Sequence, residues 1–315
     1  MKSPPISPYG VFAGHLFQYT TGGPSLIAFE SSRDKSLSVT KKCILLGGLS
    51  DGPIPCPYTK LLEGRCHELG WSLVQPVLSS SYLGFGNGGL DRDTDEIAKL
   101  MTYLVCHHRA ESFALVGHST GCQNAVHFLA SGDRELVNMI KVVALQAPVS
   151  DRESMSLTPG DHDASIQYAR SLVADKKGDE MMPRDAFWAP ITASRYISLF
   201  DLGGDDDFFS SDLSDSELSS RLGHIGRIGV ESGLRLLAAF SGRDEYVPQH
   251  VIDDYDNLMK RLVLAMNNGD PDGNVAKGMM IGSGNHNLSS GASDGEKFVE
   301  AVGGLLASNN VDQSI

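Results

Sequence analysis

The strongest indication of a fold in this sequence is the segment Gly117-His118-Ser119-Thr120-Gly121. They form the pattern G-x-S-x-G, in which a serine stands between two glycines. The apolar run at 113–116 precedes the pattern and predicts a short buried strand. A helical pattern follows it, with apolar side chains at Ala125, Val126, Phe128 and Leu129. A serine on such a strand-to-helix turn is typical of a nucleophile elbow, where its Oγ stands exposed at the carboxyl edge of a sheet.

The residues around this serine have separate expected roles. A side chain at Gly117 or Gly121 would collide with the neighbouring strand and helix, so both positions require glycine. The backbone N–H of Thr120 opens the predicted helix and points to where an oxyanion would form, and the positive end of the helix dipole adds to that field. His118 is expected to buttress the turn and to contact substrate rather than to act as a base.

Short apolar runs alternate with amphipathic helical patterns on both sides of the turn. One helical pattern covers 58–69, and a second starts near Asp93 with an apolar stripe along one face. The runs that predict strands are 25–30, 42–46, 71–78, 113–116, 142–145, 234–240 and 277–281. This alternation predicts an α/β fold with a mostly parallel central sheet and helices on both faces.

Residues 149–230 interrupt the alternation. They are polar, are broken by Gly and Pro, and contain no run typical of a strand. A long irregular insertion of this kind is the expected form of a lid over an active site. We therefore predict a core made of residues 1–148 and 231–315 and an inserted lid made of residues 149–230.

A serine nucleophile needs a histidine base, which in turn needs an orienting carboxylate. On a sheet with such an elbow the chain order is serine, acid, histidine. Asp244 lies just past the predicted strand 234–240, and its neighbour Glu245 is the weaker alternative. His286 lies on the glycine-rich loop after the last predicted strand. Ser119, Asp244 and His286 are thus the predicted catalytic triad, with no cofactor and no metal required.

The loop after the strand 42–46 should supply the second oxyanion donor. It reads Leu46-Gly-Gly-Leu-Ser-Asp-Gly52, and the backbone N–H of Leu49 is the expected donor. The two glycines let the backbone approach the substrate closely. Gly48 and Ser50, on either side of Leu49, are predicted to bind substrate.

Composition excludes several classes of partner. The 315 residues include 39 acidic and 26 basic ones, a net charge of −13, which opposes binding to nucleic acids and to anionic membranes. No apolar run reaches the length of about 18 residues that a membrane span needs, and the first eight residues do not resemble a signal peptide. Five cysteines without a CxxC pair indicate reduced thiols and a cytoplasmic protein.

The segment Gly84-Phe-Gly-Asn-Gly-Gly89 also satisfies the dinucleotide fingerprint G-x-G-x-x-G. No acidic residue ends the next strand about 20 residues later, as that fingerprint requires. The loop 79–92 is also too long for the tight turn on which a pyrophosphate rests. We therefore predict no nucleotide here and interpret the segment as a flexible loop at the mouth of the pocket.

These motifs together resemble one family, the fungal siderophore (fusarinine C) esterases of the α/β-hydrolase superfamily, with their uncharacterised plant and fungal relatives. The stretches that carry the resemblance are 46–52, 117–121, 145–153, 190–195, 204–213 and 240–248. The resemblance implies an α/β-hydrolase fold and a carboxylic-ester hydrolase with Ser119, Asp244 and His286 in the triad roles. It implies a small-molecule ester as substrate, siderophore-like or from another specialised metabolite.

The sequence is compatible with other functions on the same scaffold. The same scaffold could serve as a small-molecule receptor or, with His286 as base, as a lyase, and the oligomeric state is undetermined. The segment 201–217 carries seven acidic residues and no basic one. It is expected to be a solvated surface loop; a sharper hypothesis is that its charge faces the pocket entrance and attracts substrates that bear amines.

Overall fold

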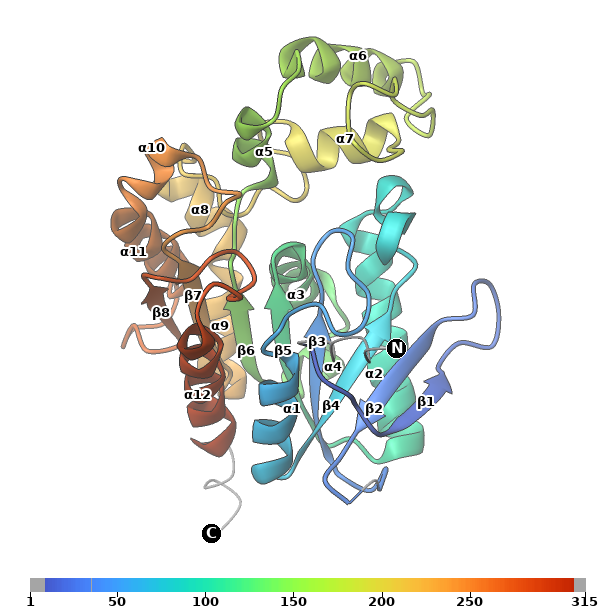
Figure 1. Cartoon of the computed structure of the whole chain (residues 1–315), viewed down its shortest axis with the longest axis vertical. Coiled ribbons are helices and arrows are strands. Elements are labelled where there is room, and N and C mark those ends of the chain that lie inside the picture. The colour runs from blue at the N-terminus through green and yellow to red at the C-terminus, as the bar shows by residue number, and fades with distance from the viewer. Residues whose placement is uncertain (1–8, 35, 309–315) are drawn as a thin grey trace, which may run out of the picture.

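Eight strands form a single sheet in the part of the chain that the computed structural model describes, residues 9–34 and 36–308. Their order across the sheet is β1-β2-β4-β3-β5-β6-β7-β8 (Figure 1). The strands are β1 His15–Gln18, β2 Ile27–Ser31, β3 Lys41–Leu46, β4 Trp71–Val77, β5 Ser112–His118, β6 Ile140–Gln146, β7 Arg235–Ser241 and β8 Ala276–Ile281. Neighbouring strands from β4 to β8 are parallel, whereas β2 runs antiparallel to both β1 and β4.

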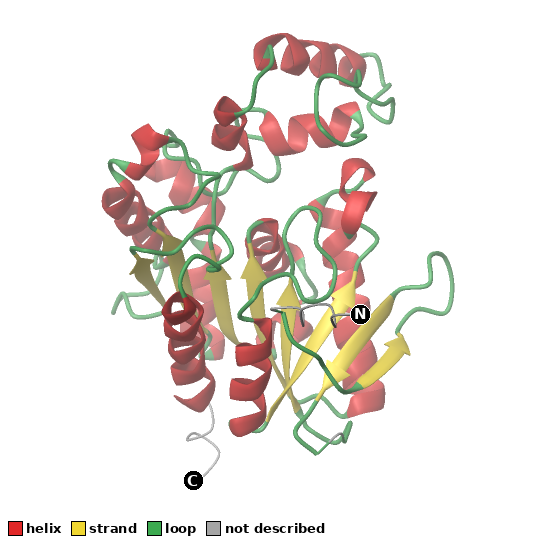
Figure 2. Ribbon diagram, in the orientation of Figure 1, coloured by secondary structure: helices red, strands yellow, loops and turns green. Residues whose placement is uncertain are grey.

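Helices cover both faces of the sheet (Figures 1 and 2). The first half of the chain contributes α1 Thr59–Glu68, the 3₁₀ helix η1 Tyr82–Asn87, α2 Leu90–His108, α3 Thr120–Ser131 and α4 Arg134–Asn138. The second half contributes α5 Asp151–Ser154, the 3₁₀ helix η2 Met155–Leu157, α6 His162–Ala174, α7 Ala193–Phe200, α8 Asp215–Leu222, α9 His224–Ser232, α10 Gln249–Ile252, α11 Tyr255–Met266 and α12 Ala292–Ser308. Helices α1 and α12 lie on one face, and α2, α3 and α9 lie on the other.

Each face of the sheet buries its own apolar cluster, as expected for strands covered on both sides. On the face of α2, the side chains of Ile97 and Leu100 are completely buried. On the opposite face Tyr58 packs against Phe298 with 5.0 Å between the ring centroids. The apolar stripe predicted from the sequence is therefore the buried face of α2, although the helix already begins at Leu90.

The sequence predicts seven of the eight strands to within two residues and misses β1. That strand has only four residues, and it pairs with β2 alone at the edge of the sheet. Its side chains are mostly exposed, with Leu16 exposed to 68%. An exposed edge strand needs no apolar run, so it leaves no periodic signal in the sequence.

The chain between β6 and β7 is helical and has two parts. Helices α5, α6 and α7, which we call the cap helices, lie above the carboxyl ends of the strands (Figure 1). They enclose an apolar cluster of their own that includes Leu172, Tyr196 and Leu199. Helices α8 and α9 instead contact α11 and α3 of the sheet layers. The division into a core and a lid at residues 149 and 230 stays a prediction.

The glycine-rich segment 84–89 differs from the flexible loop that the sequence predicts. Most of it forms η1, and Phe85 in its middle is only 2% exposed. The ring of Phe85 packs against Phe187 and Trp188, which precede α7. The carbonyl of Gly86 accepts a hydrogen bond from the backbone N–H of Thr192 at 2.7 Å. The segment therefore anchors the cap helices to the sheet.

Candidate active site

Ser119 stands on a sharp turn between β5 and α3. Its backbone has φ 53° and ψ −125°, a combination that is rare outside glycine and is held only where surrounding contacts enforce it. The N–H of Ser119 donates to Gln146 O at 3.0 Å, and its carbonyl accepts from Cys122 N at 2.8 Å. These two bonds fix the turn against the next strand and the first turn of the helix.

The glycines on either side of Ser119 have no room for a side chain. A Cβ on Gly117 would overlap the carbonyl of Gly121, and a Cβ on Gly121 would overlap the carbonyl of Leu46 on β3. The expected requirement for glycine is confirmed, because β5, β3 and α3 approach each other here in backbone-to-backbone contact.

Asp244 and His286 meet at the carboxyl ends of β7 and β8. The carboxylate of Asp244, in a residue only 4% exposed, lies 2.9 and 2.8 Å from His286 Nδ1 through its two oxygens. It also accepts from Tyr246 N at 3.0 Å. When Nδ1 carries the proton and donates it to Asp244, Nε2 is left with the lone pair that a base needs.

Glu245, the weaker alternative for the acid, has a different contact. Its Oε2 accepts a hydrogen bond from the backbone N–H of His286 at 2.9 Å. It therefore holds the main chain of His286, whereas Asp244 holds the ring.

Gln146, at the end of β6, was not predicted as a site residue. It joins the elbow to the loop after β8 that carries His286, which we call the histidine loop. Its Oε1 accepts from His118 Nδ1 at 2.6 Å and from Tyr58 Oη at 3.2 Å. Its Nε2 donates to His286 O at 2.9 Å and to Ser241 Oγ at 3.3 Å. The signal that could have identified it is a polar residue directly after the apolar run 142–145.

His118 has the buttressing position that the sequence predicts. Burial, together with the nearby His286, lowers the pKa of His118 to about 3, so its ring is neutral near pH 7. A neutral ring that donates from Nδ1 to Gln146 stabilises the turn. Its ring centroid lies 5.0 Å from that of His286.

The loop after β3 lies against Ser119. A Cβ on Gly48 would lie 3.0 Å from Ser119 Cβ, so the loop backbone borders the serine. Asp51 Oδ2 accepts from Gly48 N at 2.8 Å, so the N–H of Gly48 is already engaged and the next N–H belongs to Leu49. Thr120 is the first residue of α3, where backbone N–H groups have no acceptor within the helix.

A cavity of about 630 Å³ lies between the sheet and the cap helices. Ser119 and His286 line it, and so do four residues predicted for the oxyanion and substrate sites, Gly48, Leu49, Ser50 and His118. Thr120 instead lines a smaller adjoining cavity, and Asp244 contacts the ring of His286. The cap side supplies an apolar wall made of Met155, Leu157, Phe187, Trp188 and Phe200.

Asp151, at the start of α5, is a pocket residue that the sequence reasoning missed. Burial, followed by the nearby Asp206, raises its pKa to about 7. Its Oδ2 accepts from Gln123 Nε2 at 3.0 Å. Asp51 and Glu245 also line the pocket, so three acidic residues, from two loops and the start of α5, border it. In the described ranges, no group of three or more His, Cys, Asp or Glu residues could hold a metal ion.

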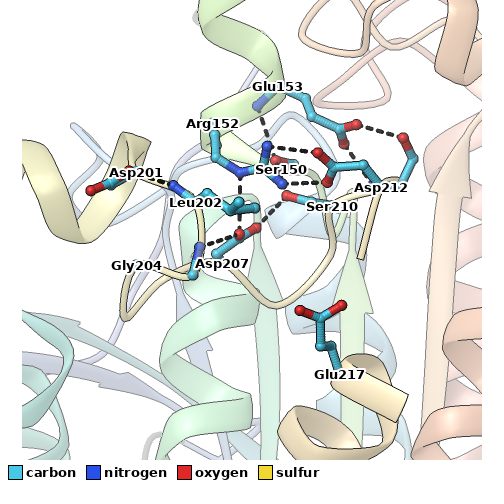
Figure 3. Close-up of polar contacts among 12 residues, drawn as sticks. Ser150, Arg152, Glu153, Asp201, Leu202, Gly204, Asp207, Ser210, Asp212 and Glu217 are labelled. Carbon is cyan, nitrogen blue, oxygen red and sulfur yellow. Dashed lines mark hydrogen bonds and ion pairs between the residues drawn. The ribbon is translucent and has the colours of Figure 1, made fainter. Parts of the chain in front are cut away.

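The acidic segment 201–217 is only partly the solvated surface loop that the sequence predicts. Asp205, Asp212, Asp215 and Glu217 are exposed, whereas Asp206 and Asp207 are each 3% exposed. Figure 3 shows Arg152 bound to Asp207, at 3.1 Å, and to Asp212. Asp206 is buried and pairs with Arg195 at 2.6 Å. The remaining acidic residues bind Arg170, Ser198, Arg261 and the N-terminus of α8. The carboxylates are thus engaged within the fold, and the 630 Å³ cavity is lined by other residues.

Comparison with known proteins places the chain among named relatives. Residues 2–307 match the family described as "Protein of unknown function (DUF1749)". UPF0613 protein PB24D3.06c of Schizosaccharomyces pombe is 35% identical, over 74% of this chain and 78% of that protein. Esterase AN6793 of Emericella nidulans is 31% identical, over 83% of this chain and 82% of the esterase. Fusarinine C esterase sidJ of Aspergillus fumigatus is 31% identical, over 81% of this chain and 83% of that enzyme.

Solved structures agree on the fold. The siderophore hydrolase EstB from Aspergillus fumigatus superposes with a TM-score of 0.75 at 29% identity, over 96% of this chain and 98% of EstB. An α/β-hydrolase fold protein of unknown function superposes with a TM-score of 0.68 at 17% identity, over 97% and 99%. The predicted α/β-hydrolase fold and the resemblance to siderophore esterases are confirmed. No described helix combines the length and the apolar character that crossing a membrane would demand.

Proposed function

We infer that this chain, which belongs to the family described as "Protein of unknown function (DUF1749)", is a serine hydrolase of small-molecule carboxylic esters. One observation carries the proposal. The strained turn of Ser119 and the ring of His286, itself bound to Asp244, line the same cavity. This is the arrangement that acyl transfer through a serine requires.

The reaction would proceed through an acyl-enzyme. Ser119 Oγ attacks the ester carbonyl while His286 Nε2 takes its proton, and Asp244 stabilises the imidazolium that forms. The N–H groups of Leu49 and Thr120 stabilise the oxyanion. His286 returns the proton to the leaving alcohol, and water then releases the acid from Ser119 by the same steps in reverse.

The cavity supports a substrate of moderate size with an apolar part. Its volume of about 630 Å³ lies within the range of small-molecule sites. The wall on the cap side, which comes from η2, the chain before α7 and the end of α7, is aromatic and aliphatic, so an acyl or alcohol group without charge can be buried there. The names of fusarinine C esterase sidJ and siderophore hydrolase EstB favour a siderophore-like or other specialised-metabolite ester.

The proposal places this reaction in the cytoplasm without a nucleic-acid partner. None of the five cysteines forms a disulfide, and four of them are buried. Free thiols fit a reducing compartment. The net charge of −13 opposes binding to a phosphate backbone.

A labelling experiment tests the proposal and separates it from its alternatives. The purified chain is treated with a fluorophosphonate probe, and the labelled peptide is identified. Ser119 should be labelled, and Ser119→Ala should lose at least about 10³-fold of p-nitrophenyl ester hydrolysis. Ser131→Ala, a substitution at the exposed far end of the same helix, is the matched control. An unlabelled Ser119 would indicate a receptor, and ester consumption that persists in Ser119→Ala would indicate a lyase.

A further inference from the structure

A second cavity of about 30 Å³ lies behind the loop that follows β3. Gly48, Leu49 and Asp51 line both this cavity and the substrate pocket. The loop after β3, which carries the expected oxyanion donor Leu49, therefore separates the substrate pocket from the small cavity. The remaining walls come from the ends of β3 and β4 and from α2, α3, η1 and α7.

Four side chains that line the small cavity present polar atoms without a partner. Asp93 Oδ1, Thr120 Oγ1, Asn124 Oδ1 and Arg195 Nε are buried and make no hydrogen bond to any residue that the structure describes. The four residues are 5%, 6%, 6% and 4% exposed. Buried polar groups in folded proteins are almost always paired with protein or with ordered water, so this concentration of unpaired atoms around one cavity calls for a ligand.

We propose that the cavity binds about two water molecules, each of which needs roughly 10–15 Å³. Two waters carry four hydrogens. One hydrogen joins the waters to each other, and three remain for Asp93 Oδ1, Thr120 Oγ1 and Asn124 Oδ1. The Arg195 Nε–H and the Thr120 hydroxyl each donate to a water oxygen, and the two waters have lone pairs enough for both. Donors and acceptors therefore balance.

The chemistry of the cavity excludes charged ligands. The guanidinium of Arg195 opposes a metal cation, and the carboxyl of Asp93 opposes an anion. Bulk excludes an organic group, because the volume is that of a few heavy atoms at most. Water both donates and accepts, so it satisfies the three acceptor oxygens and the two donors together.

The site connects the cap helices to the oxyanion donors. Arg195 belongs to α7, and its Nη1 is already fixed by Asp206 at 2.6 Å. Thr120 and Asn124 belong to the first turns of α3. Waters held between them would fix Thr120 N–H and the wall at Leu49 in place. This consequence, unlike the water site itself, rests on the proposed esterase function.

Thr120→Val tests this role because it removes the hydroxyl and keeps both the shape and the backbone N–H. We expect kcat for a p-nitrophenyl ester to fall about tenfold with KM within about twofold, because misplaced donors affect the transition state more than substrate binding. Thr120→Ser, which restores the hydroxyl, should recover most of the lost kcat. Thr102→Val on the exposed face of α2 is the matched control.

A high-resolution crystal structure of the wild-type chain tests the site directly. Density for waters within hydrogen-bond distance of Asp93, Thr120, Asn124 and Arg195 would support it, and Asn124→Leu should remove at least one of them. Protein side chains that fill the cavity instead, or waters unchanged in Asn124→Leu, would overturn it. A full kcat in Thr120→Val would overturn the positioning role. If the waters are present but the wild type hydrolyses no ester, the proposed function fails and the water site stands.

Discussion

Replacing Gln146 by methionine should weaken the fold and the site together. The amide of Gln146 is completely buried and forms the four hydrogen bonds that join the elbow to the histidine loop. Methionine has a similar length but cannot make them, so the partner groups stay buried without a partner. The bonds to His118 at 2.6 Å and to His286 O at 2.9 Å are shorter than those to Tyr58 and Ser241 at 3.2 and 3.3 Å.

The two short bonds set the size of the expected loss. A buried group that loses its neutral partner costs about 1–2 kcal/mol, and the longer bonds add less, so the free energy of unfolding should fall by about 3 kcal/mol. Urea unfolding followed by tryptophan fluorescence measures this loss. With a slope of about 3 kcal/mol per M, the midpoint should move down by about 1 M. Ester hydrolysis should also fall, because the carbonyl of His286 is no longer held.

Gln249→Met is the matched control for this experiment. Gln249 is exposed on α10, and its Nε2 donates to Asp253 Oδ1 at 2.8 Å. Losing one exposed bond should change the free energy of unfolding by less than about 0.5 kcal/mol. A Gln146→Met variant that also stayed within about 0.5 kcal/mol of the wild type would refute the account of Gln146 as the joint between elbow and histidine loop.

Three further predictions concern carboxyl groups. Asp244→Asn should strongly reduce ester turnover at neutral pH because the amide favours the wrong imidazole tautomer; a mild effect beside a severe one for Glu245→Gln would mean that the acid is misassigned. Burial raises the pKa of Asp151 from 3.8 to about 7, so the folded state binds more protons and stability falls as pH rises between those values. In urea unfolding, Asp151→Asn should therefore gain stability over the wild type above pH 7 and lose that advantage below about pH 4; an advantage that did not change with pH would contradict the assignment. Asp206→Asn breaks a buried ion pair and should cost about 3–5 kcal/mol of unfolding free energy, whereas Asp215→Asn on the surface should cost less than about 1 kcal/mol; equal losses would contradict the burial.

Patterns within short stretches of sequence, and the order of those stretches along the chain, predict the turn at Ser119 and the contact between Asp244 and His286. The elbow can be predicted because the strand, the two glycines and the helix that it needs all fall within about 20 consecutive residues. The pairing of Asp244 with His286 could be predicted from chain order, because parallel strands end at one edge and bring their following loops together. Neither inference needs the packing of distant side chains.

The features that were missed depend on residues far apart in the chain. Gln146 contacts Tyr58, 88 positions away, and Arg152 contacts Asp207, 55 positions away. A run of acidic residues has the same composition whether it is solvated or paired, so only the location of the arginines distinguishes the two. For this reason the sequence predicts the whole segment 201–217 at the surface, although Asp206 and Asp207 are each 3% exposed.

The ion pair between Arg152 and Asp207 has a consequence for how this scaffold can diversify. The chain leaves the sheet layers just before Arg152 and returns just after Asp207, and the two side chains meet at 3.1 Å. The residues between Arg152 and Asp207 therefore form a segment whose two ends are held together by this ion pair. Because the two ends are held together, a change of length within the segment need not move the ends of β6 or of the strands beside it. All five residues of the apolar cavity wall lie within this segment, whereas Ser119 and His286 lie outside it.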